Sequence, residues 1–189
     1  MTLFDEAIRY AVEKHSGMVR KRENTPYILH PLEVAAIVST ISSDEELLAA
    51  AVLHDTVEDT DATMEEIEQL FGARVAALVA SETEDKRRSL PPDMSWRIRK
   101  EESLEELKRA ADPAVKVLWL GDKLSNMRSF YRAWKISGDS IWESFNQSDP
   151  SQQAWYYRSI DTILSELKSS DAWQEFHHLV NTIFSDVDI

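Results

Sequence analysis

Apolar residues recur at helical spacing along most of this 189-residue chain, and this periodicity limits the folds that the chain can adopt. In the first segment, Phe4, Ala7, Ile8, Ala11 and Val12 would all lie on one face of a helix. The alternating pattern of a half-buried strand is nearly absent, and only 4 Gly and 6 Pro are present to interrupt helices. The sequence therefore predicts an all-α fold of helices joined by short loops.

Capping residues and prolines indicate where these helices begin and end. Thr63 and Glu66 form the pattern of a capping box, Gly72 can close the helix that follows, and Pro31 suits the first turn of another helix. The expected helices run over about residues 3–15, 31–41, 44–54, 64–71, 95–111, 113–131, 150–167 and 171–183. The longest expected loop runs over 81–93, because it contains two adjacent prolines and lacks periodicity.

A chain of this length can bury a core within one domain. We expect that domain to span residues 1–189, with a motif-bearing core at about 1–131 that helices at about 149–189 complete. No apolar run approaches the roughly 18 to 20 residues that a membrane span requires, and the start of the chain lacks the pattern of a secretory signal. These features, with the absence of cysteine, predict a cytoplasmic protein.

The formal net charge of −13 argues against broad binding to nucleic acid or to an anionic membrane, since both depend on a positive surface. A ligand that carries phosphate must therefore find a local positive site. The absence of cysteine also removes thiolate catalysis and Cys-based zinc sites from consideration. Histidines and carboxylates are left as the candidate metal ligands.

The adjacent pair His54-Asp55 combines two types of metal ligand at the end of an expected helix. Such a pair often arises by chance, with one residue buried and the other exposed, so it needs support from elsewhere in the chain. His30, at the entrance of another expected helix, offers a second imidazole. Asp122 follows an apolar run at 117–121, where a carboxylate is costly to bury unless it is paired, hydrogen-bonded or bound to metal.

Two imidazoles and two carboxylates make a mixed nitrogen and oxygen set that suits manganese, iron or zinc and leaves positions for water and substrate. A metal at such a site would lower the pKa of its bound water, and a nearby carboxylate could manage protons. Glu58 and Asp59 lie one turn beyond His54-Asp55. The pattern indicates a metal-dependent phosphohydrolase.

Several spaced motifs occur in one order over roughly residues 1–131: His15-Ser16-Gly17, Arg20-Lys21, Pro26-Tyr27-Ile28-Leu29-His30-Pro31, His54-Asp55-Thr56-Val57-Glu58-Asp59-Thr60, Trp96 with Arg99-Lys100, and Asp122-Lys123-Leu124-Ser125-Asn126. In these motifs the chain resembles the HD-domain alarmone hydrolases of the RelA/SpoT type, especially their small stand-alone, Mesh1-like members. The resemblance implies a helical HD-domain bundle with a metal site between helices. It also implies hydrolysis of the 3′-pyrophosphate of guanosine tetra- or pentaphosphate to pyrophosphate and GDP or GTP.

The resemblance implies a role for each matching residue. A divalent metal, commonly manganese, would be held by His30, His54, Asp55 and Asp122. The family's catalytic acidic pair would be Glu58 and Asp59. The nucleotide would be contacted by Arg20, Lys21, Asn126, Lys86 and Tyr156.

Four of these nucleotide contacts depend on the resemblance in different ways. Without it, Arg20 and Lys21 would be read as a solvated basic loop and Asn126 as an exposed or capping amide. The register of Lys86 is open, because Arg87 and Arg88 follow it directly. The chain also departs from the family in having Gly121 where alanine is usual and a glutamine, Gln152, in place of an arginine.

Two other functions fit the same residues. A related phosphohydrolase could act on NADPH or another nucleotide, since the metal alone does not select the substrate. A nucleotide-binding sensor without turnover would be favoured by loss of a ligand or of the acidic pair, and both are kept here. A purely structural helical protein would not need a carboxylate after an apolar run together with three further ligands. The sequence makes no prediction of the oligomeric state.

Overall fold

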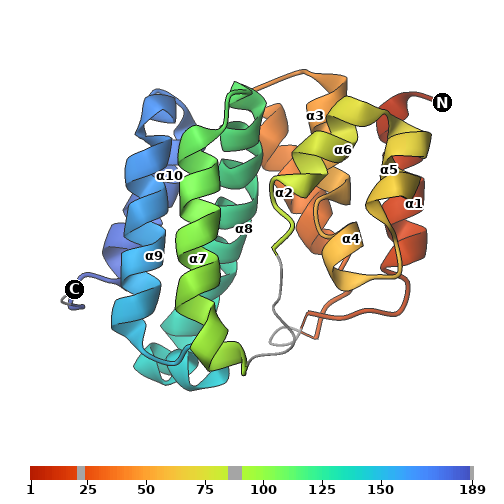
Figure 1. Ribbon diagram of the computed structural model, residues 1–189. Coiled ribbons are helices and arrows are strands. Elements are labelled where there is room, and N and C mark those ends of the chain that lie inside the picture. The colour runs from red at the N-terminus through yellow and green to blue at the C-terminus, as the bar shows by residue number, and fades with distance from the viewer. Residues whose placement is uncertain (21–23, 85–90, 188–189) are drawn as a thin grey trace. The chain divides into compact units, whose positions relative to one another are not determined.

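The computed structural model describes residues 1–20, 24–84 and 91–187. Over these residues the chain forms ten α-helices and two short 3-10 helices (Figure 1). Pairing of extended segments is limited in the described ranges to one isolated bridge between Val19 and Pro26. The prediction of an all-α fold is therefore confirmed. No described helix is both long enough and apolar enough to cross a membrane.

The chain divides into two units, of which the first comprises residues 1–83 and 112–125. Its helices are α1 (Leu3–Lys14), α2 (Leu29–Ser39), α3 (Glu45–Leu53), α4 (Thr56–Asp59), α5 (Met64–Phe71), α6 (Ala73–Ala80) and the first half of α8 (Pro113–Ser137). The second unit comprises residues 84–111 and 126–189. The prediction of one domain over 1–189 stays a prediction.

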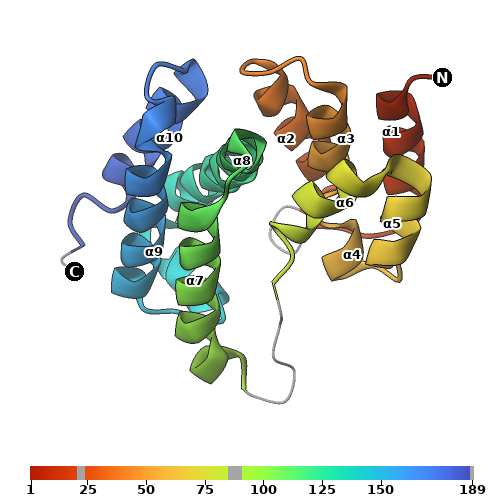
Figure 2. The same ribbon diagram turned by 45° about the horizontal axis from the view of Figure 1, so that its top comes forward.

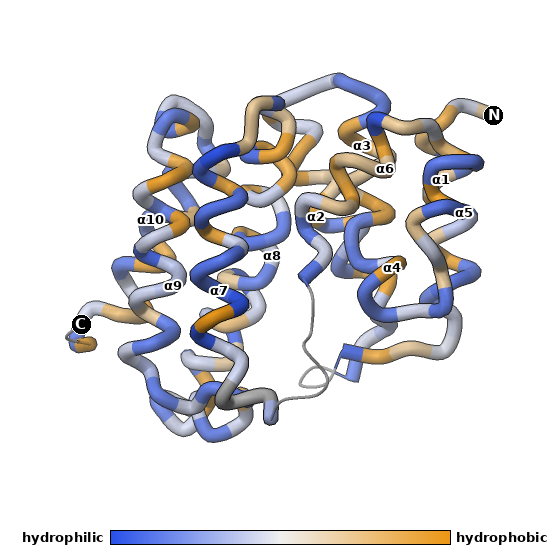
Figure 3. The backbone as a smooth tube through the Cα atoms, in the orientation of Figure 1, coloured by the Kyte–Doolittle hydropathy of each residue, from blue (hydrophilic) through white to orange (hydrophobic). Residues whose placement is uncertain are grey.

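Helix α3 is the centre of the first unit. Its residues 49–53 are all buried with no exposed surface, so the helix is covered on every side. Three consecutive alanines among them allow close approach, and α1, α2 and α6 each pack against α3 (Figure 2). Helices α2, α3 and α6 are largely apolar, in contrast to the hydrophilic helix α7 (Pro92–Arg109) of the second unit (Figure 3). Residues that follow α3 directly therefore begin inside the core.

The second unit is built on α9. Its elements are α7 (Pro92–Arg109), the second half of α8, the 3-10 helix η1 (Gly138–Ser144), α9 (Pro150–Ile163), the 3-10 helix η2 (Leu164–Leu167) and α10 (Asp171–Ile183). Helices α7 and α10 both pack against α9. Aromatic rings fill the interior, with Phe130 4.9 Å from Phe145 and Trp142 5.3 Å from Phe184 between ring centroids.

The expected helix boundaries hold where a capping side chain marks them. Thr2 closes a full capping box with Asp5 at the start of α1, and the Thr63 hydroxyl accepts from the Glu66 amide at the start of α5. Gly72 ends α5 with a φ of 91°, a left-handed conformation that favours glycine.

Other boundaries differ from the prediction. Helix α2 begins at Leu29 rather than Pro31, α7 begins inside the expected loop, and α8 continues to Ser137. Helices α4 and α6 lie outside the predicted set, and neither begins with a side-chain cap hydrogen bond. The expected helix at 150–167 is divided into α9 and η2.

Helix α8 passes very close to α2 at Gly121. A Cβ atom built on this glycine would lie 2.8 Å from Val38 Cγ2 and 3.2 Å from Val34 Cγ1. The two valine side chains therefore occupy the space that an alanine methyl would need. This packing gives a physical reason for glycine at a position where the resemblance leads us to expect alanine, and it fixes the helix just before Asp122.

Candidate metal centre

The four expected metal ligands all lie in the first unit. His30 is in the first turn of α2, His54 and Asp55 follow α3, and Asp122 lies within α8. Asp55 occupies the N-cap position of α4, but its carboxylate makes no capping hydrogen bond. Its side chain is directed instead toward the histidines. The ligands thus come from three helices whose packing, rather than whose sequence spacing, brings them together.

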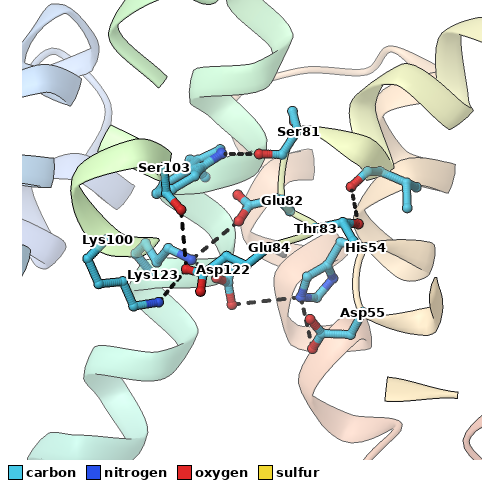
Figure 4. Close-up of polar contacts among 12 residues, drawn as sticks. His54, Asp55, Ser81, Glu82, Thr83, Glu84, Lys100, Ser103, Asp122 and Lys123 are labelled. Atoms are coloured by element: carbon cyan, nitrogen blue, oxygen red, sulfur yellow. Dashed lines mark hydrogen bonds and ion pairs between the residues drawn. The ribbon is translucent and has the colours of Figure 1, made fainter. Parts of the chain in front are cut away.

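The ligand atoms form a tight cluster. His30 Nε2 lies 3.1 Å from Asp122 Oδ1 and 3.5 Å from Asp55 Oδ2. His54 Nε2 lies 3.2 Å from Asp55 Oδ2 and 3.7 Å from Asp122 Oδ1. Figure 4 shows the His54 ring directed at the two carboxylates. His30, His54 and Asp122 are buried, and one ligand atom from each lies within 4.8 Å of the others.

The hydrogen bonds of His54 determine which of its nitrogens faces the cluster with a lone pair. Its Nδ1 lies 2.9 Å from the Ala51 carbonyl oxygen, which can only accept, so Nδ1 carries a proton. In the neutral ring the lone pair is then on Nε2. This nitrogen is buried and makes no hydrogen bond of normal geometry among the described residues, although carboxylate oxygens lie close to it. Such an orphaned lone pair is what a metal ligand requires.

His30 is held in the same tautomer by a different route. The Ser125 hydroxyl donates to Glu33 at 2.7 Å, so its oxygen is left to accept a proton from His30 Nδ1 at 2.9 Å. The lone pair of His30 is therefore also on Nε2, facing Asp55 and Asp122. Two imidazole lone pairs and two carboxylates converge on one point, and this donor set fits a divalent metal.

In the absence of a cation, a proton binds the lone pair of His54 that faces the carboxylates. Burial disfavours a charged His54, but the charges of Asp55 and Asp122 outweigh that penalty and raise the pKa of His54 well above its ordinary value. Burial likewise opposes ionisation of Asp122, yet the Lys123 ammonium and the two histidines lower the pKa of this carboxyl well below its ordinary value. A divalent cation must displace the proton on His54, so its binding strengthens as pH rises.

Asp122 is fixed from its other side by a buried ion pair. The Lys123 ammonium contacts Asp122 Oδ2 and lies 3.3 Å from Glu82 Oε2 (Figure 4). It also lies over the Trp119 ring at 4.4 Å. Because Lys123 holds Oδ2, the oxygen that faces the histidines is Oδ1.

Asp59 is linked to the metal ligands through Tyr27. The Tyr27 hydroxyl lies 2.6 Å from Asp55 Oδ2 and 2.9 Å from Asp59 Oδ2. Asp59 and Glu58 close the short helix α4 that follows Asp55. The Asp59 carboxylate is therefore within hydrogen-bond distance of Tyr27, which also contacts the expected metal ligand Asp55.

The expected nucleotide contacts are less fully described. Lys21 and Lys86 lie outside the described residues. Arg20 lies in the first unit, on the segment between α1 and α2, where its backbone pairs with that of Thr25. Asn126 and Tyr156 belong to the second unit, so their position relative to the metal ligands stays a prediction.

Tyr156 lies in the packing of α7 against α9. It is 3% exposed, its ring centroid is 5.9 Å from that of Trp96, and the Lys100 ammonium lies 4.8 Å above it. One turn earlier, Gln152 accepts a hydrogen bond of 2.8 Å from Arg97. The Arg97 guanidinium of α7 therefore lies beside position 152, where the resemblance leads us to expect an arginine.

Several residues around the centre have no role predicted from the sequence. Tyr27, Lys123 and Ser125 belong to the matching motifs, whereas Glu33 and Glu82 do not. A signal was present for two of them. Glu33 lies three residues after His30 on α2, and Ser125 lies three residues after Asp122 on α8, so each shares a helix face with a ligand. For Glu82, which follows the end of α6, no sequence signal pointed to the centre.

The chain is similar to a known family of proteins in both sequence and structure. The chain matches the HD domain over residues 7–146. It is 44% identical over 130 residues to the guanosine-3′,5′-bis(diphosphate) 3′-pyrophosphohydrolase MESH1 of Danio rerio, a match that covers 67% of this chain and 68% of that protein. Among solved structures, a metazoan ortholog of SpoT that hydrolyses ppGpp matches with a TM-score of 0.73 and 30% identity, over 98% of this chain and 95% of the other.

Longer proteins also match. The GTP pyrophosphokinase rsh of Brucella ovis is 43% identical over 129 residues, which are 67% of this chain but 17% of that protein. The chain thus spans about one sixth of the length of these relatives.

Proposed function

The chain belongs to the HD-domain family, and on that premise we propose that it is a metal-dependent phosphohydrolase that removes the 3′-pyrophosphate of guanosine tetra- or pentaphosphate. The products are pyrophosphate and GDP or GTP. The observation that carries the proposal is the convergence of two Nε2 lone pairs and two carboxylates within the first unit. The named activity of relatives that this chain matches over two thirds of their length supports the choice of substrate.

His30, His54, Asp55 and Asp122 are the residues that hold the metal in this proposal, with Mn²⁺ as the resident ion. A mixed nitrogen and oxygen donor set without sulfur is compatible with Mn²⁺. When bound, the cation activates water and offsets the negative charge of the phosphate groups. Ser125 and the Ala51 carbonyl keep the two imidazoles in the tautomer that presents Nε2.

Glu58 and Asp59 are the proposed catalytic acidic pair. Asp59 is exposed at the end of α4 and lies near Asp55 through their shared contact with Tyr27, so it is placed to take or return a proton beside the ligands. We propose that the nucleotide is bound by the side chains of Arg20, Lys21, Lys86, Asn126 and Tyr156. Guanidinium and ammonium groups are suited to phosphate, and they supply the local positive site that a chain of net charge −13 requires.

The test is release of pyrophosphate and GDP from guanosine tetraphosphate by the purified protein with Mn²⁺. Asp122→Asn is expected to abolish turnover, because the neutral amide removes one anionic ligand while it keeps the shape of the side chain. Asp61→Asn is the matched control, since Asp61 lies in the same unit with its side chain 87% exposed. NADPH is assayed in parallel.

Each outcome selects one function. Loss of activity in Asp122→Asn alone supports the proposal. A folded, Mn²⁺-loaded protein that leaves guanosine tetraphosphate intact but hydrolyses NADPH overturns the substrate and keeps the metal centre. Nucleotide binding without turnover of either compound identifies a sensor.

A further inference from the structure

Tyr27 is fixed from three sides next to the metal ligands. Its backbone N–H donates to the Met18 carbonyl at 2.9 Å, and its ring packs on His15 with centroids 4.9 Å apart and planes tilted by 30°. Its hydroxyl reaches Asp55 and Asp59. A side chain held at its backbone, its ring and its tip has little freedom to move.

His15 serves this placement rather than the chemistry. It is 2% exposed, and neither of its ring nitrogens has a hydrogen-bond partner among the described residues. Burial lowers the pKa of His15, which keeps the ring neutral and suited to packing against an aromatic face. His15 belongs to the first of the sequence motifs, His15-Ser16-Gly17, and its structural role is to support the Tyr27 ring.

The Tyr27 hydroxyl has one proton but two carboxylate oxygens within hydrogen-bond distance. It can donate fully to only one of them at a time. Asp55 Oδ2 is also the oxygen that faces both histidines, so a cation bound there would make it a weaker acceptor. The phenol proton is then directed to Asp59 Oδ2, 2.9 Å from the hydroxyl oxygen.

We propose that Tyr27 is a positioning residue that holds Asp59 beside the metal ligand Asp55. This inference deepens the proposed function and rests on its assignment of Asp55 and Asp59. Asp59 is exposed on a helix of four residues, and a partner that holds its carboxylate limits the orientations that it can adopt. Tyr27 supplies such a partner from a segment 32 residues away in the chain.

A first experiment tests the contact in the protein loaded with a diamagnetic divalent cation and without any substrate. The protein is labelled with 3-fluorotyrosine, and the resonance that disappears in Tyr27→Phe is assigned to Tyr27. In Asp59→Asn that resonance is expected to shift, because the acceptor changes from a carboxylate to an amide, whereas Asp61→Asn leaves it in place. A Tyr27 resonance that is the same in Asp59→Asn and in the wild type overturns the proposal.

A second experiment tests the consequence for catalysis. Misplacing a catalytic group by about 1 Å can cost up to about a hundredfold in rate, so Tyr27→Phe is expected to lower kcat about tenfold or more. The KM and the Kd for Mn²⁺ are expected to stay within about threefold, since no ligand is removed. Tyr10→Phe, which removes a phenol from α1 of the same unit, serves as the matched control and keeps the wild-type kcat. A parallel loss of Mn²⁺ affinity in Tyr27→Phe would show that the phenol serves Asp55 instead and would overturn the proposal.

The double variant completes the test. If Tyr27 acts through Asp59, adding Tyr27→Phe to Asp59→Asn lowers kcat much less than Tyr27→Phe does alone. Equal effects in both backgrounds contradict the inference. Failure of the proposed function is separate: the wild type would then not hydrolyse guanosine tetraphosphate, while the fluorotyrosine spectra would still decide the contact.

Discussion

Glu82 is buried, and its described contacts do not fully offset the free-energy cost of removing its carboxyl group from water. Its side chain is 3% exposed, Oε2 pairs with Lys123, and Oε1 has no hydrogen-bond partner in the described part of the chain. Burial raises the pKa of Glu82 to about 8 in spite of the Lys123 ammonium. A buried carboxylate of this kind is weak support for stability, and its value lies in holding Lys123 against Asp122.

Glu82→Gln is expected to make the metal-free protein less sensitive to pH. The folded pKa of about 8 lies above the unfolded value of about 4.5, so the contribution of Glu82 to stability is complete below pH 4.5 and is lost as pH rises through 8. The glutamine side chain of the variant does not ionise, so the variant loses no stability by this route as pH rises. Its stability relative to the wild type should therefore increase between pH 5 and pH 8, which urea unfolding with a chelator present would measure. Parallel pH profiles for the two proteins, with exposed Glu68→Gln as control, would contradict this account.

At the scale of the element, α3 depends on its N-cap. Asp44 accepts from the amides of Glu46 and Leu47 at 3.1 and 3.4 Å, and it forms an ion pair of 2.6 Å with Arg74. Both contacts favour the ionised carboxyl, and the pKa of Asp44 is lowered, with Arg74 as the largest cause.

Asp44→Ala should cost more stability than Asp44→Asn. Alanine loses the cap, worth about 1 kcal/mol, whereas asparagine caps almost as well and loses only the ion pair. That pair is partly exposed on both sides, so its contribution is at most about 1 kcal/mol. Chemical denaturation of the two variants and of Arg74→Ala measures the difference. Equal losses in the two Asp44 variants would show that the ion pair, and not the cap, stabilises α3.

The close approach of α8 to α2 gives a second prediction for an element. In an exposed helix, Gly121→Ala would stabilise by about 1 kcal/mol. Here the new methyl meets Val38 Cγ2 at 2.8 Å, so a net loss of stability is expected. Val38→Ala removes the obstructing atom, so Gly121→Ala should cost less stability in the Val38→Ala background than in the wild type. A Gly121→Ala protein that melts above the wild type would show that α8 can move away from α2.

At the scale of the whole molecule, the metal ligands join segments that are distant in sequence. Residues 30, 54, 55 and 122 come from α2, from the end of α3 and from α8, so a bound cation connects all three within the first unit. A ligand that binds only the folded state adds about 2.7 kcal/mol of stability at a hundred times its Kd.

Mn²⁺ is therefore expected to raise the Tm by roughly 5 to 10 °C at that concentration, for a chain of this size. Differential scanning calorimetry with and without the cation makes the measurement. Asp122→Asn should show little rise, while Asp61→Asn should respond like the wild type. A similar rise in all three proteins would place the bound Mn²⁺ elsewhere.

The sequence by itself determined the helical class, the boundaries at Thr2 and Thr63, and the identity of the candidate ligands. These depend on local information: apolar period, capping side chains, and a carboxylate placed after an apolar run. The same information failed for α6, which begins at Ala73 after the N-cap Gly72 and has no side-chain cap.

Only the tertiary structure decided how the ligands are presented. The lone pair of His54 follows from the Ala51 carbonyl, that of His30 from Ser125, and the choice of Oδ1 as the Asp122 oxygen that faces the histidines follows from Lys123. Of these three contacts, those of Ala51 and Lys123 are local in sequence, but the structure shows which atom of each ligand they occupy. The contact of Ser125 with His30 joins segments 95 residues apart and depends on the packing of α2 and α8. Tyr27 reaches Asp59 across 32 residues of chain for the same reason. Contacts between distant segments arise from packing, which residue spacing along one helix does not encode.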